Sequence, residues 1–421
     1  MFLLPYPAGK RFAFTIVDDT DGATLENVGP VYECLRELGF RTTKTVWIEP
    51  PRVGEASSGS LGDTLQRRDY SEFVESLHEW GFEIALHNVT GDSNRREQVL
   101  GGLEAFRAQF GRYPRMNIQH EKNRENLYFD FAQDSGRLRA EFSTRAARWI
   151  QRAVDRTNGR TVERAKPHPC CGEDPDSPYF WGDLCRSRIQ YVRTNVFLCE
   201  LDTIRTSPHI PFHHDDTPWV NYWFDCSNGA DRERFTELLR ERQVRRLIDG
   251  CGCALVYTHF GKGFCEAGPR GFQLNPHVRR RLERIASRRD GWFAPASEVL
   301  DRLLAFHKVL LGGFPGGMLV ENGNPYPLRS VTIWDAPRRR YWLVGGSEIE
   351  ADEEGRIVLP TLSAGSRMAL VGRDVCRQAS RWNEDSPPGW RKDIGMLANK
   401  AFERLYAKLC HRRAWRVREE S

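Results

Sequence analysis

The sequence lacks the features that mark several common classes of protein. No apolar run approaches the ~20 residues needed to span a bilayer, and the first residues show no signal-peptide pattern. Its 11 cysteines include no pair with the C-x-x-C spacing of zinc ribbons and redox motifs. The motifs G-x-S-x-G and G-x-G-x-x-G are also absent, which disfavours a serine hydrolase and a dinucleotide-binding enzyme.

The cysteine content and the charge indicate the cellular compartment and the kind of binding partner. An odd number of cysteines without the regular spacing of a disulfide scaffold indicates a reducing compartment, so we expect a cytoplasmic protein. The net charge of +5 is mild, and residues 400–421 alone carry seven basic and three acidic side chains. The remainder is close to neutral, which argues against nucleic-acid binding. We expect a small-molecule or glycan substrate, and the oligomeric state stays open.

The chain divides into a long region of alternating elements and a shorter region of strands. From residue 12 to about 305, strand-like and helix-like patterns alternate, which predicts a parallel sheet with helical crossovers. About seven strand-like runs favour an α/β barrel with fewer than eight strands. We therefore expect an α/β barrel domain over 1–311, a small antiparallel β subdomain over 318–375, and a loop with a basic amphipathic helical tail over 376–421. The subdomain contains no histidine, so we expect it to supply no catalytic group.

Four short apolar runs end in residues that can bind a metal or transfer a proton. Runs of this length, bounded by turn signals, indicate buried strands, and in barrel-like α/β folds the carboxyl ends of the strands face a common mouth. Two carboxylates and three imidazoles are therefore expected to share one site. The residues that follow the four runs are Asp18 and Asp19, His87, His120 and His259.

The adjacent aspartates can divide two chemical roles. Successive side chains diverge along a strand, so one carboxylate can bind a metal while its neighbour accepts a proton. A metal held by carboxylate and imidazole ligands with an open position makes water more acidic and polarises a carbonyl. The free carboxylate then serves as a base and a further histidine as an acid.

These residues resemble the motifs of the polysaccharide deacetylase (NodB-homology, carbohydrate esterase-like) superfamily over roughly residues 12–300. The resemblance implies a deformed (β/α)7 barrel and metal-assisted hydrolysis of an N-acetyl group on an amino sugar. Three segments carry it: Thr15-Ile16-Val17-Asp18-Asp19 resembles the first motif, T-F-D-D; Gly81-Phe82-Glu83-Ile84-Ala85-Leu86-His87 resembles G-h-E-I-x-x-H; and Leu255-Val256-Tyr257-Thr258-His259 resembles L-x-x-H.

The resemblance also implies roles for individual residues. Asp18 corresponds to the general base, Asp19 and His87 to metal ligands, and His259 to the general acid. The second motif of the family carries another histidine where this chain has Gly91, and its third motif, R-x-P-Y, is absent. Since His120 follows a strand at that point, we expect it to replace the missing ligand. The expected site is thus Asp19, His87 and His120 around a divalent metal, with zinc as the expected ion.

Substrate contacts and two other functions remain open at this stage. Candidate sugar contacts are Asn123, Asn126, Trp181, Tyr222 and Trp223, although each of the three aromatic residues fits a buried core position equally well. One alternative is a non-catalytic carbohydrate-binding barrel that has lost its metal. The other is a glycosidase that uses Asp18 and a second carboxylate such as Asp225, which requires a pair about 5–10 Å apart across a cleft.

Overall fold

The structure, a computed structural model, describes residues 2–51, 61–121, 123–129, 170–197, 200–269, 271–314, 317–334, 340–343 and 348–372. The tail expected over 376–421 lies outside these residues. The chain forms two compact units, of which the larger runs from Lys10 to Leu304. The other contains the first residues up to Gly9 and the described residues from Ala305 onward.

The larger unit contains alternating strands and helices. Its strands are β2 (Phe12–Asp18), β3 (Thr43–Val46), β4 (Glu83–Leu86), β5 (Met116–Asn117), β6 (Tyr191–Phe197), β7 (Tyr222–Asn228), β8 (Cys253–Thr258), β9 (Cys265–Gly268), β10 (Gly271–Leu274) and β11 (Gly291–Trp292). Its helices are α1 (Leu25–Glu37), α2 (Arg68–Glu79), α3 (Arg96–Phe110), α6 (Gly182–Arg188), α7 (Thr203–Thr206), α8 (Arg232–Leu238), α9 (Glu241–Asp249) and α10 (Pro276–Ala286). A further helix, α11 (Ala296–Phe306), begins in this unit, and its last two residues belong to the other.

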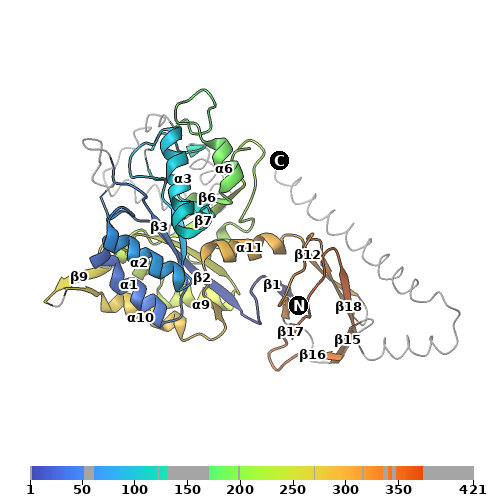
Figure 1. The fold of residues 1–421 in the computed structure, drawn as a ribbon. Coiled ribbons are helices and arrows are strands. Elements are labelled where there is room, and N and C mark those ends of the chain that lie inside the picture. The colour runs from blue at the N-terminus through green and yellow to red at the C-terminus, as the bar shows by residue number, and fades with distance from the viewer. Residues whose placement is uncertain are drawn as a thin grey trace, which may run out of the picture. The chain divides into compact units, whose positions relative to one another are not determined.

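Seven parallel strands close into a barrel with helices on the outside (Figure 1). The order is β2-β3-β4-β5-β6-β7-β8, and β8 pairs again with β2 from Ala13↔Cys253 to Asp18↔Thr258. The short strand β11 adds to the start of β2. Every residue of β2 is buried, as expected for a parallel strand whose two faces are both covered. The predicted seven-stranded α/β barrel is confirmed.

The connection from β2 to α1 is held by local hydrogen bonds. Thr24 caps the helix, because its Oγ1 accepts from the backbone N of Asn27 at 3.3 Å while Asn27 Oδ1 accepts from the backbone N of Thr24 at 2.8 Å. The Asn27 amide also donates to the carbonyl oxygen of Gly22 at 2.9 Å. The residues between β2 and α1 are therefore fixed by the helix that follows them.

The smaller unit consists of antiparallel strands, as the sequence predicted. One sheet has the order β1-β14-β17 and the other β12-β13-β18-β15-β16. Because β1 pairs with β14, the N-terminal residues belong to this unit and not to the barrel region where the expected boundaries put them. The strands are β1 (Phe2–Leu4), β12 (Val309–Phe314), β13 (Gly317–Asn322), β14 (Thr332–Trp334), β15 (Arg340–Leu343), β16 (Glu348–Glu350), β17 (Ile357–Val358) and β18 (Arg367–Gly372).

Within the described ranges, no helix combines the length and the apolar character that a membrane crossing demands.

Candidate metal centre

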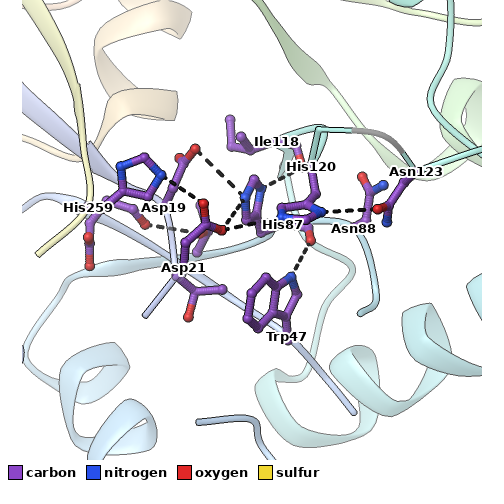
Figure 2. A network of polar contacts seen from close by, with 12 residues as sticks. Asp19, Asp21, Trp47, His87, Asn88, Ile118, His120, Asn123 and His259 are labelled. Atoms are coloured by element: carbon purple, nitrogen blue, oxygen red, sulfur yellow. Dashed lines mark hydrogen bonds and ion pairs between the residues drawn. The ribbon is translucent and has the colours of Figure 1, made fainter. Parts of the chain in front are cut away.

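The carboxyl ends of four barrel strands bring acidic and imidazole side chains together. Asp19 and Asp21 follow β2, His87 follows β4, His120 lies three residues after β5, and His259 follows β8. These strands are parallel members of one barrel, so their carboxyl ends share one rim. Figure 2 shows the five side chains gathered at this rim, with Asp21 between His259 on one side and the other two histidines on the other.

Asp18 does not take part in this cluster. Its carboxylate is fully buried, and Oδ1 accepts from the backbone N of Phe260 at 2.7 Å. Its Oδ2 accepts from the hydroxyl of Tyr32 at 2.8 Å and lies 3.0 Å from Lys44 Nζ. Asp18 therefore links β2 to α1, to β3 and to the segment after β8. The partners of Asp18 are Phe260, Tyr32 and Lys44, none of which belongs to the histidine cluster, so the expected base role does not fit this position.

Asp19 points to the opposite side, as the alternation of strand side chains requires. Both of its oxygens accept from the guanidinium of Arg193, at 2.8 and 2.7 Å, in the two-pronged geometry of strong arginine–carboxylate pairs. Its Oδ2 lies 3.8 Å from His87 Nε2. Burial raises the pKa of the Asp19 carboxyl, but Arg193 and the nearby histidines outweigh burial and hold that pKa below its usual value. Asp19 is thus ionised at neutral pH.

Asp21 is the carboxylate that lies closest to the histidines. Its Oδ1 lies 3.1 Å from His87 Nε2 and 3.7 Å from His120 Nε2. Its Oδ2 lies 2.9 Å from His259 Nε2. Asp21, His87 and His120 are all buried, and each offers one ligand atom within 4.8 Å of the others. The three-residue set is therefore Asp21, His87 and His120, whereas the expected set contained Asp19.

The tautomers of His87 and His120 are fixed by the hydrogen bonds of their Nδ1 atoms. His87 Nδ1 lies 3.1 Å from the carbonyl oxygen of Ile118, which can only accept, so this nitrogen carries the proton. His120 Nδ1 lies 3.1 Å from the side-chain oxygen of Asn123, so it too carries the proton when the ring is neutral. Both Nε2 atoms then present lone pairs toward Asp21, as in metal-binding histidines whose other N–H donates to an oxygen.

This arrangement fits a cation. A neutral His87 places its Nε2 lone pair 3.1 Å from the negative oxygen of Asp21, which is repulsive unless a proton or a metal ion lies between them. Ligands about 2.0–2.1 Å from a tetrahedral zinc ion lie roughly 3.4 Å apart, close to the separations found here. One carboxylate with two imidazoles is also a donor set that suits zinc.

The pKa shifts in the cluster favour ligand-competent protonation states. Burial, with a further contribution from His87, lowers the pKa of His120, so its ring is neutral at neutral pH. Burial raises the pKa of Asp21, but the two rings of His259 and His87 close to this carboxylate outweigh burial and lower the pKa well below its usual value. A neutral imidazole and an ionised carboxylate are the forms that bind a metal.

His259 is oriented by the loop after β7. Its Nδ1 donates to the carbonyl oxygen of Ala230 at 2.7 Å, which leaves Nε2 facing Asp21. Lys262 Nζ lies 3.2 Å from the same oxygen of Asp21. Asp21 Oδ2 therefore contacts His259 and Lys262. Asp21 Oδ1 faces His87 and His120.

Gly261 allows the two loops that carry Asp21 and His259 to approach each other. A Cβ atom on Gly261 would lie 2.4 Å from the backbone carbon and oxygen of Gly22, a distance that Cβ atoms do not adopt. A side chain at this position would push the loop after β2 away from the loop after β8. The glycine is therefore required by close backbone approach.

Trp47 supports both histidines from the end of β3. Its indole N–H donates to the carbonyl oxygen of His87 at 2.8 Å, and its ring stacks on the His87 ring with centroids 6.0 Å apart. Its ring also meets the His120 ring edge-on at 5.6 Å. Because Trp47 is fully buried, it restricts the rotation of both imidazoles (Figure 2).

Four of the five residues expected to contact a sugar are buried, and the fifth lies at the other end of the barrel. Trp181 and Trp223 are buried and donate to Glu125 O and Thr217 Oγ1, so neither ring is open for stacking. Tyr222 is the first residue of β7 and lies at the amino end of the barrel, opposite the cluster. Asn123 and Asn126 are buried and bind His120. Burial and strand position thus argue against these five residues as sugar contacts.

The carboxylate pair expected for a glycosidase is also buried. Asp225 is fully buried on β7, accepts from Ser207 Oγ at 2.5 Å, and accepts from Thr194 Oγ1. Asp18, the other member, contacts Lys44 as described above. Both carboxylates are fully buried and bound to partners within the barrel, which disfavours this alternative.

Sequence reasoning missed Asp21, Arg193 and Trp47. Asp21 carried a usable signal, since it lies two residues after Asp19 in a loop that begins at the same strand end. Arg193 lies inside β6, and Trp47 directly follows β3. Neither position differs in the sequence from ordinary structural residues.

Comparisons with known proteins give only distant structural similarity. No protein-family model matches the chain, and no curated protein matches it either. A structure from Mycobacterium smegmatis named as a polysaccharide deacetylase is 14% identical, covers 73% of this chain and 95% of its own, and gives a TM-score of 0.40. The Puue allantoinase structure is 10% identical over 72% of this chain and 94% of its own, also at 0.40. Scores this low establish neither family membership nor activity.

Proposed function

We propose that this protein is a metal-dependent hydrolase of a C–N amide bond that deacetylates an N-acetylated sugar or a related polar substrate. Asp21, His87 and His120 hold a divalent ion, with zinc as the preferred ion. The observation that carries the proposal is the 3.1 Å approach of His87 Nε2 to Asp21 Oδ1 while His87 Nδ1 is committed to a carbonyl oxygen. A bound divalent ion supplies Lewis-acid polarisation of a carbonyl oxygen and makes water more acidic.

Asp19 is the candidate base in this proposal. It is ionised, buried, and oriented by two hydrogen bonds from Arg193, and it lies 3.8 Å from the ligand nitrogen of His87. A carboxylate in this position accepts a proton from the attacking water. The role that the sequence suggested for Asp18 thus passes to its neighbour.

His259 is the candidate acid. Its Nδ1–H is bound to the carbonyl oxygen of Ala230, so a proton gained by the ring is carried on Nε2, which faces the cluster. That proton is given to the amine nitrogen as the C–N bond breaks. The proton taken up by Asp19 and the proton released by His259 balance the addition of one water to the amide.

An acetate-release assay tests the proposal. Zinc-loaded protein is incubated with N-acetylglucosamine oligomers, and acetate is measured with and without a chelator. We expect release that stops on metal removal, returns on zinc addition and falls in His259→Ala. Zinc binding without acetate release from these oligomers would keep the metal site and reject deacetylation of this substrate. Absence of both zinc binding and release would reject the metal site and favour the carbohydrate-binding barrel that has lost its metal.

A further inference from the structure

We propose that Glu125 is a positioning residue that sets the tautomer of His120 through the side chain of Asn123. This inference rests on the proposed metal site. It explains why His120 Nε2 carries a lone pair that can bind the metal. Neither residue touches the metal or the substrate in this account. Their effect is to decide which ring nitrogen of His120 carries the proton.

The orientation of the Asn123 amide follows from its surroundings. Its nitrogen lies among three acceptors: the carbonyl oxygen of Thr90 at 3.2 Å, that of Asp92 at 2.7 Å, and Glu125 Oε1 at 2.9 Å. The amide NH₂ belongs at this end because an amide oxygen would face three acceptors without a donor. The oxygen of Asn123 is therefore left to face His120 Nδ1 at 3.1 Å (Figure 2).

Glu125 is itself fixed by several donors. Its Oε1 accepts from the side-chain amides of Asn88 and Asn94, both at 2.9 Å, in addition to Asn123. Its Oε2 accepts from the backbone N of Asn94 at 3.0 Å. The Glu125 residue is only 1% exposed, so water does not replace these donors. The loops that follow β4 and β5 are thus joined through one carboxyl group.

The alternative tautomer would work against metal binding. His120 Nε2 lies 3.7 Å from Asp21 Oδ1, so a ring released from Asn123 gains by moving its proton to Nε2 and donating to that carboxylate. The nitrogen that should bind the metal would then be protonated. Orienting hydrogen bonds of this kind typically change metal affinity by about 10–100-fold when removed.

Two variants and one control test the inference. Glu125→Gln replaces one acceptor by an NH₂ group that must face N–H donors, and Asn123→Ala removes the acceptor for His120 Nδ1. Glu83→Gln is the matched control: Glu83 is also buried and accepts from Thr43 Oγ1 at 2.7 Å and Ser297 N at 3.1 Å, but it lies at the amino end of β4. We expect both variants to weaken zinc binding by about 10–100-fold and Glu83→Gln to leave it unchanged.

The tautomer itself is measured without metal. Long-range ¹H–¹⁵N spectra of ¹⁵N-histidine-labelled, chelator-treated full-length protein should show His120 protonated at Nδ1, and Asn123→Ala should shift the proton to Nε2. A wild-type ring protonated at Nε2 overturns the inference even if a variant fails to fold. Equal zinc affinity of the wild type and both variants also overturns it. If the wild type binds no zinc, the proposed function fails, and the spectra alone decide the tautomer.

Discussion

Lys44 and Asp18 form an ion pair between the neighbouring strands β2 and β3, with Lys44 Nζ 3.0 Å from Asp18 Oδ2 and both side chains fully buried. Because Asp18 is bound to Lys44, we assign the two adjacent aspartates different roles. Asp18 stabilises the barrel wall, and Asp19 faces the candidate metal centre.

Removing Lys44 should destabilise the protein strongly. Lys44→Met leaves the Asp18 carboxylate buried without its cation, a change that typically costs about 3–5 kcal/mol. We expect a corresponding loss in the free energy of unfolding, measured by urea titration in the presence of a chelator. Arg68→Met is the control, since Arg68 pairs with Glu72 at an exposed position and its loss should have little effect. Equal, small effects of the two substitutions would contradict a structural role for Asp18.

Asp19→Asn should keep the metal and lose turnover. The amide cannot accept the proton of the attacking water, so we expect kcat to fall by on the order of 10²–10⁴ while zinc content is maintained. Steady-state kinetics and metal analysis of the same preparation check this, with unfolding measured alongside because Arg193 loses its partner. If Asp18→Asn abolishes turnover in a stably folded protein while Asp19→Asn does not, the base is Asp18 after all.

The metal-free protein should lose stability as the pH falls below about 6.5. Burial and His87 lower the pKa of His120 in the folded state, so below this pH the unfolded chain binds a proton that the folded His120 still excludes. Stability therefore rises with pH until the unfolded histidine is neutral. We expect His120→Gln to flatten the dependence just below about pH 6.5, measured by thermal unfolding with chelator. An unchanged slope would mean that His120 does not contribute.

Gly261→Ala should distort the geometry of the metal centre although it replaces none of the polar side chains of the centre. The added methyl group would lie 2.4 Å from the backbone of Gly22 and force apart the loops that carry Asp21 and His259. We expect lower zinc affinity and slower turnover. Gly101→Ala serves as the control, because no atom lies within 4 Å of its Cβ position on α3 and alanine favours helix by about 0.5–1 kcal/mol. Matching behaviour of the two variants would argue against the close approach.

Much of the fold follows from the sequence because buried parallel strands form continuous apolar runs. The residues of β2 and β8 are almost all buried, and the parallel order then places the residues after them on one rim. His87, His120 and His259 were identified on this basis, and the structure brings their ring nitrogens around Asp21.

The rest depends on packing between residues distant in sequence. Which of Asp18 and Asp19 faces the rim is decided by Lys44 and Arg193, 26 and 174 positions away from their partners, and a sequence pattern does not connect such pairs. The same holds for Trp47 against His87 and for Glu125 against Asn94. The roles of Trp181 and Trp223 could not be told from residue type, since aromatic residues suit a buried core and a sugar-binding site equally.

Zinc binding by wild-type, Asp21→Asn and Asp19→Asn protein tests the central claim most directly. Each protein is stripped with a chelator and titrated with zinc by competition against a chromophoric chelator. The account predicts about one zinc ion per wild-type chain, clearly weaker binding by Asp21→Asn because a charged ligand becomes neutral, and near-normal binding by Asp19→Asn. Wild-type protein that binds no zinc, or Asp21→Asn that binds as tightly as wild type, would contradict it.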